Sequence, residues 1–88
     1  MQTTVAAVDT AANARPCRVG FVTMVAGGGA ALTLALKDGS GAGATLWSAT
    51  IAAGTCQHFL LGGRPRLSFA IGLYLDLTNP GTVTVGWV

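Results

Sequence analysis

Hydrophobic and polar positions alternate along short stretches of this chain, most clearly in its last third. Residues 72–78 read GLYLDLT and residues 82–88 read TVTVGWV. Because successive side chains of a strand point to opposite faces, each segment predicts a strand with one apolar face. Asn79-Pro80-Gly81 between them has the composition of a turn. We therefore predict a C-terminal antiparallel hairpin whose apolar face packs on a core.

Similar short alternating runs, separated by glycine-rich turns, fill the rest of the chain. From Cys17 onward, simple alternation places Val19, Phe21 and Val25 on the face that carries Cys17. Residues 11–14 have short side chains and are expected to form a loop. The further strand candidates are residues 3–8, 16–25, 30–37, 45–51, 55–61 and 67–69. Seven or eight short strands at roughly 8–12-residue spacing, with no segment of helical period, predict a small antiparallel all-β sandwich or barrel.

Length and composition indicate one domain that depends on neighbours. A chain of 88 residues buries only about 60–65% of its unfolded surface, so its stability alone is marginal. Charged residues make up 9% and hydrophobic residues 51% of the chain, whereas about 25% charge is usual. We predict that copies of the chain or a larger assembly cover part of its surface; a monomer with a neutral surface of small residues is the alternative. Residues 15–88 are assigned to the sandwich. Residues 1–14 are assigned to an edge strand or an arm that joins a neighbour's sheet.

Several function classes are not expected. No run of about 18 residues is uniformly apolar, so no membrane-spanning helix is predicted. The formal net charge of +2 is too small to indicate nucleic-acid binding. Met1 is not followed by the basic and apolar segments of a secretory signal. One histidine and two cysteines without CxxC spacing predict no metal or cofactor. Whether Cys17 and Cys56 form a disulfide or stay as free, buried thiols is left open.

The residues that could carry chemistry do not form a catalytic set. The glycine runs 27–29 and 39–43 lack the Lys-Ser/Thr of a phosphate loop and are expected to be hairpin turns. Cys56 and His58 share a strand face, but nothing nearby orients them or stabilises an oxyanion. Asp38 is expected to cap its own turn, and Asp76 to face solvent. No catalytic residue is assigned, and the protein is not expected to be an enzyme.

The remaining candidates are contacts with a partner. Arg64-Pro65-Arg66 is the densest charge, and Arg15 and Arg18 could join it in the fold. Arginine is enriched at interfaces, although a solvated loop is the alternative for these residues. The tryptophans and phenylalanines fall mostly on apolar faces and are expected to anchor the core. Tyr74, on a polar face, is kept as a candidate contact.

The order DGSGAGATLWSATIAAG, an apolar strand, and then LSFAIGLYLDLTNPGTVTVGWV resembles a group of small tailed-phage virion proteins. These are short β-sandwich modules described as head decoration, cement or fibre-associated proteins, and the resemblance covers roughly residues 18–88. It implies a jelly-roll-like sandwich that binds the outside of a capsid, commonly as a homotrimer. The implied partner is the major capsid protein, and the implied location is the virion exterior, after assembly in the host cytoplasm. No catalytic residue is implied.

Three alternatives remain at this point. A tail- or fibre-associated module would recognise host-surface glycan through exposed aromatic side chains. An enzyme would need a site built on Cys56 and His58. A secreted or other non-viral sandwich would be favoured by a disulfide between Cys17 and Cys56.

Overall fold

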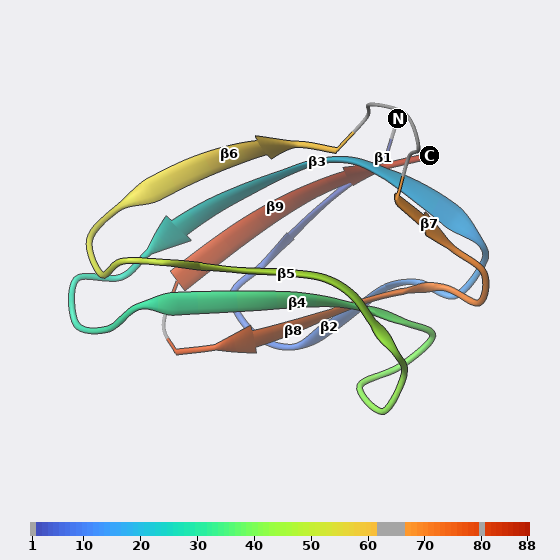
Figure 1. The fold of residues 1–88 in the computed structure, drawn as a ribbon, viewed down its shortest axis with the longest axis horizontal. Coiled ribbons are helices and arrows are strands. Elements are labelled where there is room, and N and C mark those ends of the chain that lie inside the picture. The colour runs from blue at the N-terminus through green and yellow to red at the C-terminus, as the bar shows by residue number, and fades with distance from the viewer. Residues whose placement is uncertain (1, 62–66, 80) are drawn as a thin grey trace.

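The computed structural model describes residues 2–61, 67–79 and 81–88, and its described part is all β, with nine strands (Figure 1). No helix of this part is long and apolar enough to cross a membrane. The strands are β1 (Gln2–Ala6), β2 (Thr10–Asn13), β3 (Cys17–Ala26), β4 (Leu32–Asp38), β5 (Thr45–Ile51), β6 (Cys56–Leu60), β7 (Leu67–Phe69), β8 (Leu73–Thr78) and β9 (Gly81–Trp87). The predicted all-β class is confirmed. One strand more is present than predicted, because residues 10–13 pair as β2 where a loop was expected.

The strands form two antiparallel sheets, the upper and lower layers of Figure 1. Sheet A has the order β1-β9-β3-β6, and β7 also pairs with β3; sheet B has the order β2-β8-β4-β5. If β7 is left out, the strands pair as β1 with β9, β2 with β8, β3 with β6 and β4 with β5. Each pair lies inside the previous one along the chain. Such nested pairing over two sheets is the jelly-roll arrangement. The predicted jelly-roll-like sandwich is therefore confirmed.

The predicted C-terminal hairpin is wrong. β8 pairs with β2 and β4 in sheet B, whereas β9 pairs with β1 and β3 in sheet A. The chain crosses from one sheet to the other between Thr78 and Gly81, so the apolar faces of β8 and β9 meet across the core. Alternation alone shows that two strands share a core, but it does not distinguish pairing in one sheet from packing across two. Glycines 27–29 likewise connect different sheets, and only the 39–43 turn, between β4 and β5, closes a hairpin.

Strand β3 changes phase at Gly20, which simple alternation did not predict. Its pairing with β9 slips between Val19 and Phe21, the mark of a β-bulge. Cys17 and Val19 are buried before the bulge, but Val22 and Met24 are buried after it. Phe21 and Val25 consequently leave the face that carries Cys17 and turn outward.

The core lies between the sheets, and no polar or charged residue of the described chain is buried in it. The leucines of β4 and β8 face the valines of β3 and β9. Trp47 of β5 meets Phe59 of β6 edge-on, with 5.2 Å between ring centroids, and links the sheets at one side of the sandwich. The fully buried large side chains are Phe69, Met24, Leu32, Leu34, Leu36, Leu73, Leu75, Val19, Val22, Val83 and Val85.

The N-terminal segment pairs within its own chain. β1 is the edge of sheet A beside β9, and β2 is the edge of sheet B beside β8. The Asp9 carboxylate between them accepts a hydrogen bond of 2.8 Å from the backbone N–H of Leu77. Residues 2–13 therefore complete both sheets of the sandwich.

Candidate partner-binding surfaces

The outer face of sheet A carries no charge along most of its length. Strand register aligns Val5, Thr84, Thr23 and His58 in one row across β1, β9, β3 and β6. We use the name outer face of sheet A for the residues whose side chains point away from the core: Thr3, Val5, Phe21, Thr23, Val25, Cys56, His58, Leu60, Thr82, Thr84 and Gly86. Arg18, at one end of β3, is the only charged residue in the strands of sheet A.

Large apolar side chains stand exposed on this face. Leu60 is 79% exposed, Val5 66% and Val25 49%. The ring of Phe21 lies over Gly86, where an added Cβ would overlap it. The Phe21 ring also lies 5.6 Å from the His58 ring, and Thr23 Oγ1 shares a hydrogen bond of 2.6 Å with His58 Nδ1. The face thus combines exposed apolar side chains with uncharged polar ones, and side-chain contacts hold Phe21, Thr23 and His58 in place.

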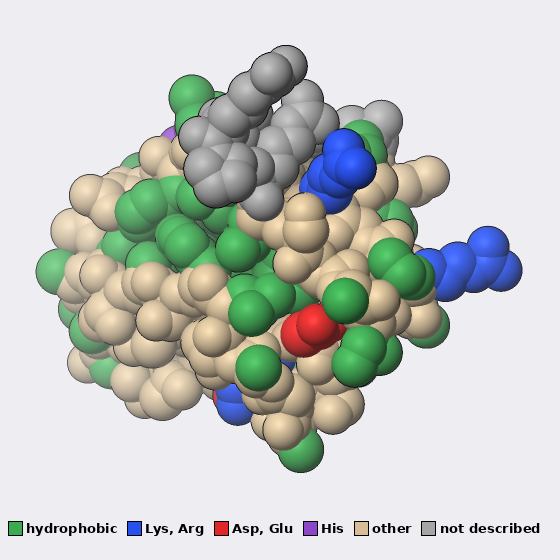
Figure 2. Space-filling model, turned by 45° about the vertical axis from the view of Figure 1, so that its right-hand side comes forward, with side chains coloured by type: hydrophobic (Ala, Val, Ile, Leu, Met, Phe, Trp, Pro, Cys, Tyr) green, Lys and Arg blue, Asp and Glu red, His purple; other side chains and the backbone are tan. Residues whose placement is uncertain are grey.

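The outer face of sheet B is polar and its groups are partnered within the chain. Lys37 Nζ lies 2.7 Å from Asp76 Oδ2, and Thr33 Oγ1 shares a hydrogen bond of 2.9 Å with Thr50 Oγ1. The outward position predicted for Asp76 is confirmed. Charged side chains are few and separated over the view of the molecule in Figure 2. The two sheets therefore present chemically different exteriors.

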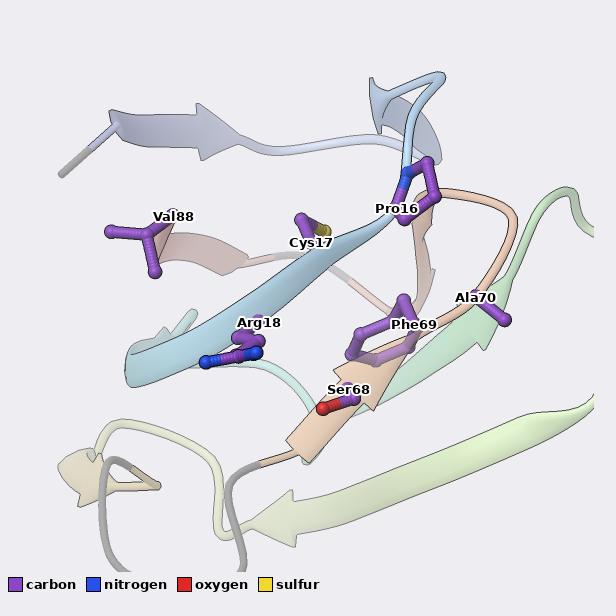
Figure 3. Close-up of a pocket in the computed structure, with 7 residues that line it drawn as sticks. All are labelled: Pro16, Cys17, Arg18, Ser68, Phe69, Ala70 and Val88. Carbon is purple, nitrogen blue, oxygen red and sulfur yellow. The ribbon is translucent and has the colours of Figure 1, made fainter.

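A hollow of about 420 Å³ opens where β3 begins and β7 pairs with it. Its lining residues are Pro16, Cys17, Arg18, Ser68, Phe69, Ala70 and Val88 (Figure 3). The backbones of Arg18 and Val88 exchange two hydrogen bonds of 2.9 Å, and Arg18 lies opposite Ser68 in the register of β3 and β7. Figure 3 shows Arg18 and Ser68 on the same side of these strands, with Cys17 projecting on the other side.

Among the described residues that line the hollow, Arg18 is the only one with a charged side chain. Burial raises the pKa of the Cys17 thiol, which outweighs the opposing hydrogen bond with Asn13, and the negative charge of Asp38 raises it further. A raised pKa keeps this thiol neutral near pH 7, so Cys17 adds no negative charge beside Arg18. The described lining of the hollow therefore offers one positive side chain, with exposed Pro16 and Val88 beside it.

Asp38 has a structural role that differs from the one predicted. Its carboxylate accepts hydrogen bonds from the backbone N–H groups of Ile71 at 2.9 Å, Gly72 at 3.2 Å and Ala70 at 3.4 Å, not from its own turn. The bond from Ile71 is the main cause that lowers the pKa of Asp38. Asp38 thus ties the end of β4 to the connection between β7 and β8.

The structure brings together only part of the predicted contact set. Arg18 lines the hollow, whereas exposed Arg15 lies in the connection between β2 and β3 and does not line it. Tyr74 lies on the outer face of sheet B, half-buried and close to Gly41 of the β4–β5 turn. Arg64 and Arg66 lie outside the described residues. The apolar outer face of sheet A was missed, because unbroken alternation placed Phe21 and Val25 of β3 on the same face as Cys17.

Cysteine and histidine do not meet in a reactive pair. Cys17 is buried and Cys56 is exposed, and the two thiols are not bonded. Of the two possibilities that the sequence left open, the structure has the free thiols; Cys17 is buried, whereas Cys56 is exposed and not buried as that possibility supposed. His58 contacts Thr23 and Phe21, and no hydrogen bond joins it to Cys56 in the described chain. Across residues 2–61, 67–79 and 81–88, no group of three or more metal-ligating side chains occurs. No protein-family model, curated protein or solved structure matches the chain.

Proposed function

We propose that this chain is a phage capsid decoration or cement protein that adheres through the outer face of sheet A. The observation that carries the proposal is the uncharged, apolar character of that face, with Leu60 79% exposed and Val5 66% exposed. The apolar side chains of this face lie among threonines, and exposed apolar surface without charge is found at interaction sites. On the outer face of sheet B, by contrast, the charged side chains of Lys37 and Asp76 form an ion pair with each other.

The proposed mechanism is adhesion without chemistry. Covering the exposed side chains removes apolar area from water, at about 25 cal/mol per Å². The absence of charge lets the face be covered without the desolvation penalty of an ionised group. When one copy touches several neighbours, rupture has to break several contacts together, so weak individual contacts add mechanical strength. Binding of the folded chain would also shift its own folding equilibrium toward the native state.

Fold and sequence support the same function by analogy. Jelly rolls recur in viral capsid and lectin domains, although a fold alone does not define a function. Residues 18–88 resemble phage head decoration and cement proteins, as argued above. The proposed partners are the major capsid protein and further copies of this chain, with a homotrimer favoured. The proposed location is the capsid exterior, reached from the host cytoplasm during assembly.

The first experiment is a count of copies by quantitative mass spectrometry of purified phage particles from the source of this chain. A copy number on the scale of the major capsid protein is the expected result. A handful of copies per particle would favour the alternative function, a tail- or fibre-associated module that binds host-surface glycan. Complete absence from the particles would overturn the virion function altogether.

A pair of variants locates the adhesive face. Leu60→Glu places a charge on the outer face of sheet A, and Leu46→Glu places one at a leucine, 41% exposed, on the outer face of sheet B. Both variants should fold, which thermal melts would verify. In a sedimentation assay with particles that lack the chain, Leu60→Glu should abolish attachment while Leu46→Glu retains it. Equal attachment of the two variants would remove the outer face of sheet A from the proposal.

Self-association has its own test. Light scattering of the recombinant chain should give a mass above that of a monomer, in line with the proposed homotrimer. A monomer at high concentration would leave the capsid protein as the only partner of the exposed face.

A further inference from the structure

Strand β7 is not one of the nested jelly-roll pairs, and its pairing with the start of β3 forms one side of the hollow. β3 spans Cys17–Ala26, but β6 pairs only with Phe21–Val25. The three-residue strand β7 pairs with the unmatched start of β3 and brings Ser68 opposite Arg18. The hollow therefore lies at an end of sheet A, apart from the exposed leucine and valines described above.

The walls and the charge of the hollow are complementary to one kind of ligand. Its volume of about 420 Å³ is within the range of roughly 300–1,000 Å³ of small-molecule sites. Pro16 and Val88 are exposed and supply apolar surface beside Arg18. Phe69 also lines the hollow, but it is 1% exposed and packs in the core. Arg18 is exposed and forms no salt bridge with a carboxylate of the described chain. An unpaired guanidinium over apolar walls fits an anion that carries an apolar body.

We propose that this hollow binds a small monocarboxylate with an aliphatic or aromatic body. The planar guanidinium of Arg18 matches a carboxylate by donating two parallel hydrogen bonds. The hydroxyl of Ser68, on the neighbouring strand, is an additional donor. Among the described residues that line the hollow, one positive side chain balances one negative charge, whereas a phosphate near −2 would keep an unmatched charge. The apolar body of the ligand lies against Pro16 and Val88. The site does not depend on the capsid function.

Nuclear magnetic resonance titration of the full chain tests the ligand class. Hexanoate should produce saturable shifts in the backbone signals of Arg18, Ser68, Phe69 and Val88. Hexanol has a similar apolar body without the charge, and acetate has the charge without the body. Each should bind at least about tenfold more weakly than hexanoate, as expected when a charged hydrogen bond or the apolar contact is lost. Equal binding of hexanol, or no saturable shift at these residues with hexanoate, would overturn the proposal.

Two arginine variants test the assigned residue. Arg18→Gln should weaken hexanoate binding by about tenfold or more. Arg18→Lys should weaken it by less, since lysine keeps the positive charge but cannot donate two parallel hydrogen bonds from a planar group. Arg15→Gln removes an exposed arginine that does not line the hollow, and it should leave the affinity within about twofold. Unchanged resonances elsewhere in the spectrum would verify folding of each variant. An equal loss in Arg15→Gln would mean that the anion is held by general positive charge and would contradict the site.

Discussion

The phase change in β3 predicts different effects on stability for substitutions at two valines that lie three residues apart. Val22 is fully buried, and Val25 is 49% exposed on the outer face of sheet A. Unbroken alternation from Cys17 and Val19 would place them the other way round. Substituting each by alanine makes the same chemical change on the same strand, with the same loss of strand propensity of at most about 1 kcal/mol. The difference between the two variants therefore reports burial alone.

The expected difference follows from the buried side chain. Val22→Ala removes two carbons from the core, about 1.6 kcal/mol at roughly 0.8 kcal/mol each. The cavity left in the packed interior raises the cost to about 2–3 kcal/mol. Val25→Ala should cost no more than about 1 kcal/mol, which is the propensity loss. At about 4–8 °C per kcal/mol for a domain of this size, the melting temperature of Val22→Ala should fall by roughly 8–24 °C.

The assay is urea unfolding of the wild type and the two variants, followed by circular dichroism. It is run at several protein concentrations, because self-association through the outer face of sheet A would bury Val25 and raise its apparent cost. Melting curves give an independent order of stability. A larger loss in Val25→Ala than in Val22→Ala, at concentrations where the chain is monomeric, would show that the phase of β3 does not change at Gly20.

Three further predictions concern stability. Hydrogen bonds, chiefly from the Ile71 N–H, lower the pKa of Asp38. The ionised carboxylate therefore stabilises the fold above about pH 4, and this stabilisation is lost as the pH falls through the lowered pKa. Asp38→Asn should flatten the acid side of a plot of melting temperature against pH, and parallel plots would contradict this. Gly86→Ala should cost about 1–3 kcal/mol, because the new Cβ overlaps the Phe21 ring. Phe21→Ala in that background should recover part of the loss in urea unfolding, and no recovery would mean that another contact is responsible. Deleting residues 1–14 removes β1, β2 and buried Ala6, so cooperative unfolding should disappear; a sharp transition would show that the remainder folds alone.

The positions of most strands were predictable from sequence, because a strand shows as an alternation of apolar and polar residues along the chain. β5 and β7 have the predicted bounds, Thr45–Ile51 and Leu67–Phe69. The partners of each strand were not predictable in this way. β8 and β9 are neighbours along the chain but belong to different sheets, and an apolar face has the same pattern in either arrangement. Strand β2 was missed because its short side chains have little strand propensity of their own.

The candidate sites depend on features that are not local. Arg18 was selected from its charge, but its hollow exists only because β7 pairs with the start of β3, about 50 positions later in the chain. The backbone partners of Asp38 are more than 30 positions away, whereas the sequence suggested a cap within its own turn. The share of β3 in the outer face of sheet A follows from the slip in register at Gly20. No periodicity argument predicts such a slip, since a bulge adds one residue without changing the residue types around it.

The bulge at Gly20 connects the stability of the fold to its proposed adhesion. By reversing the phase of β3, it buries Val22 and Met24 and turns Phe21 and Val25 outward. Phe21 then lies beside Leu60, and Val25 lies beside Cys56. A strand without the bulge would instead leave Met24 outward and send Phe21 toward the core. The register slip thus supplies both a packed interior and an apolar exterior from one strand. A failure of the prediction for Val22 and Val25 would therefore also remove the valine and phenylalanine from the surface to which we assign binding. The Leu60→Glu experiment would remain valid in that case, because the exposure of Leu60 depends on β6.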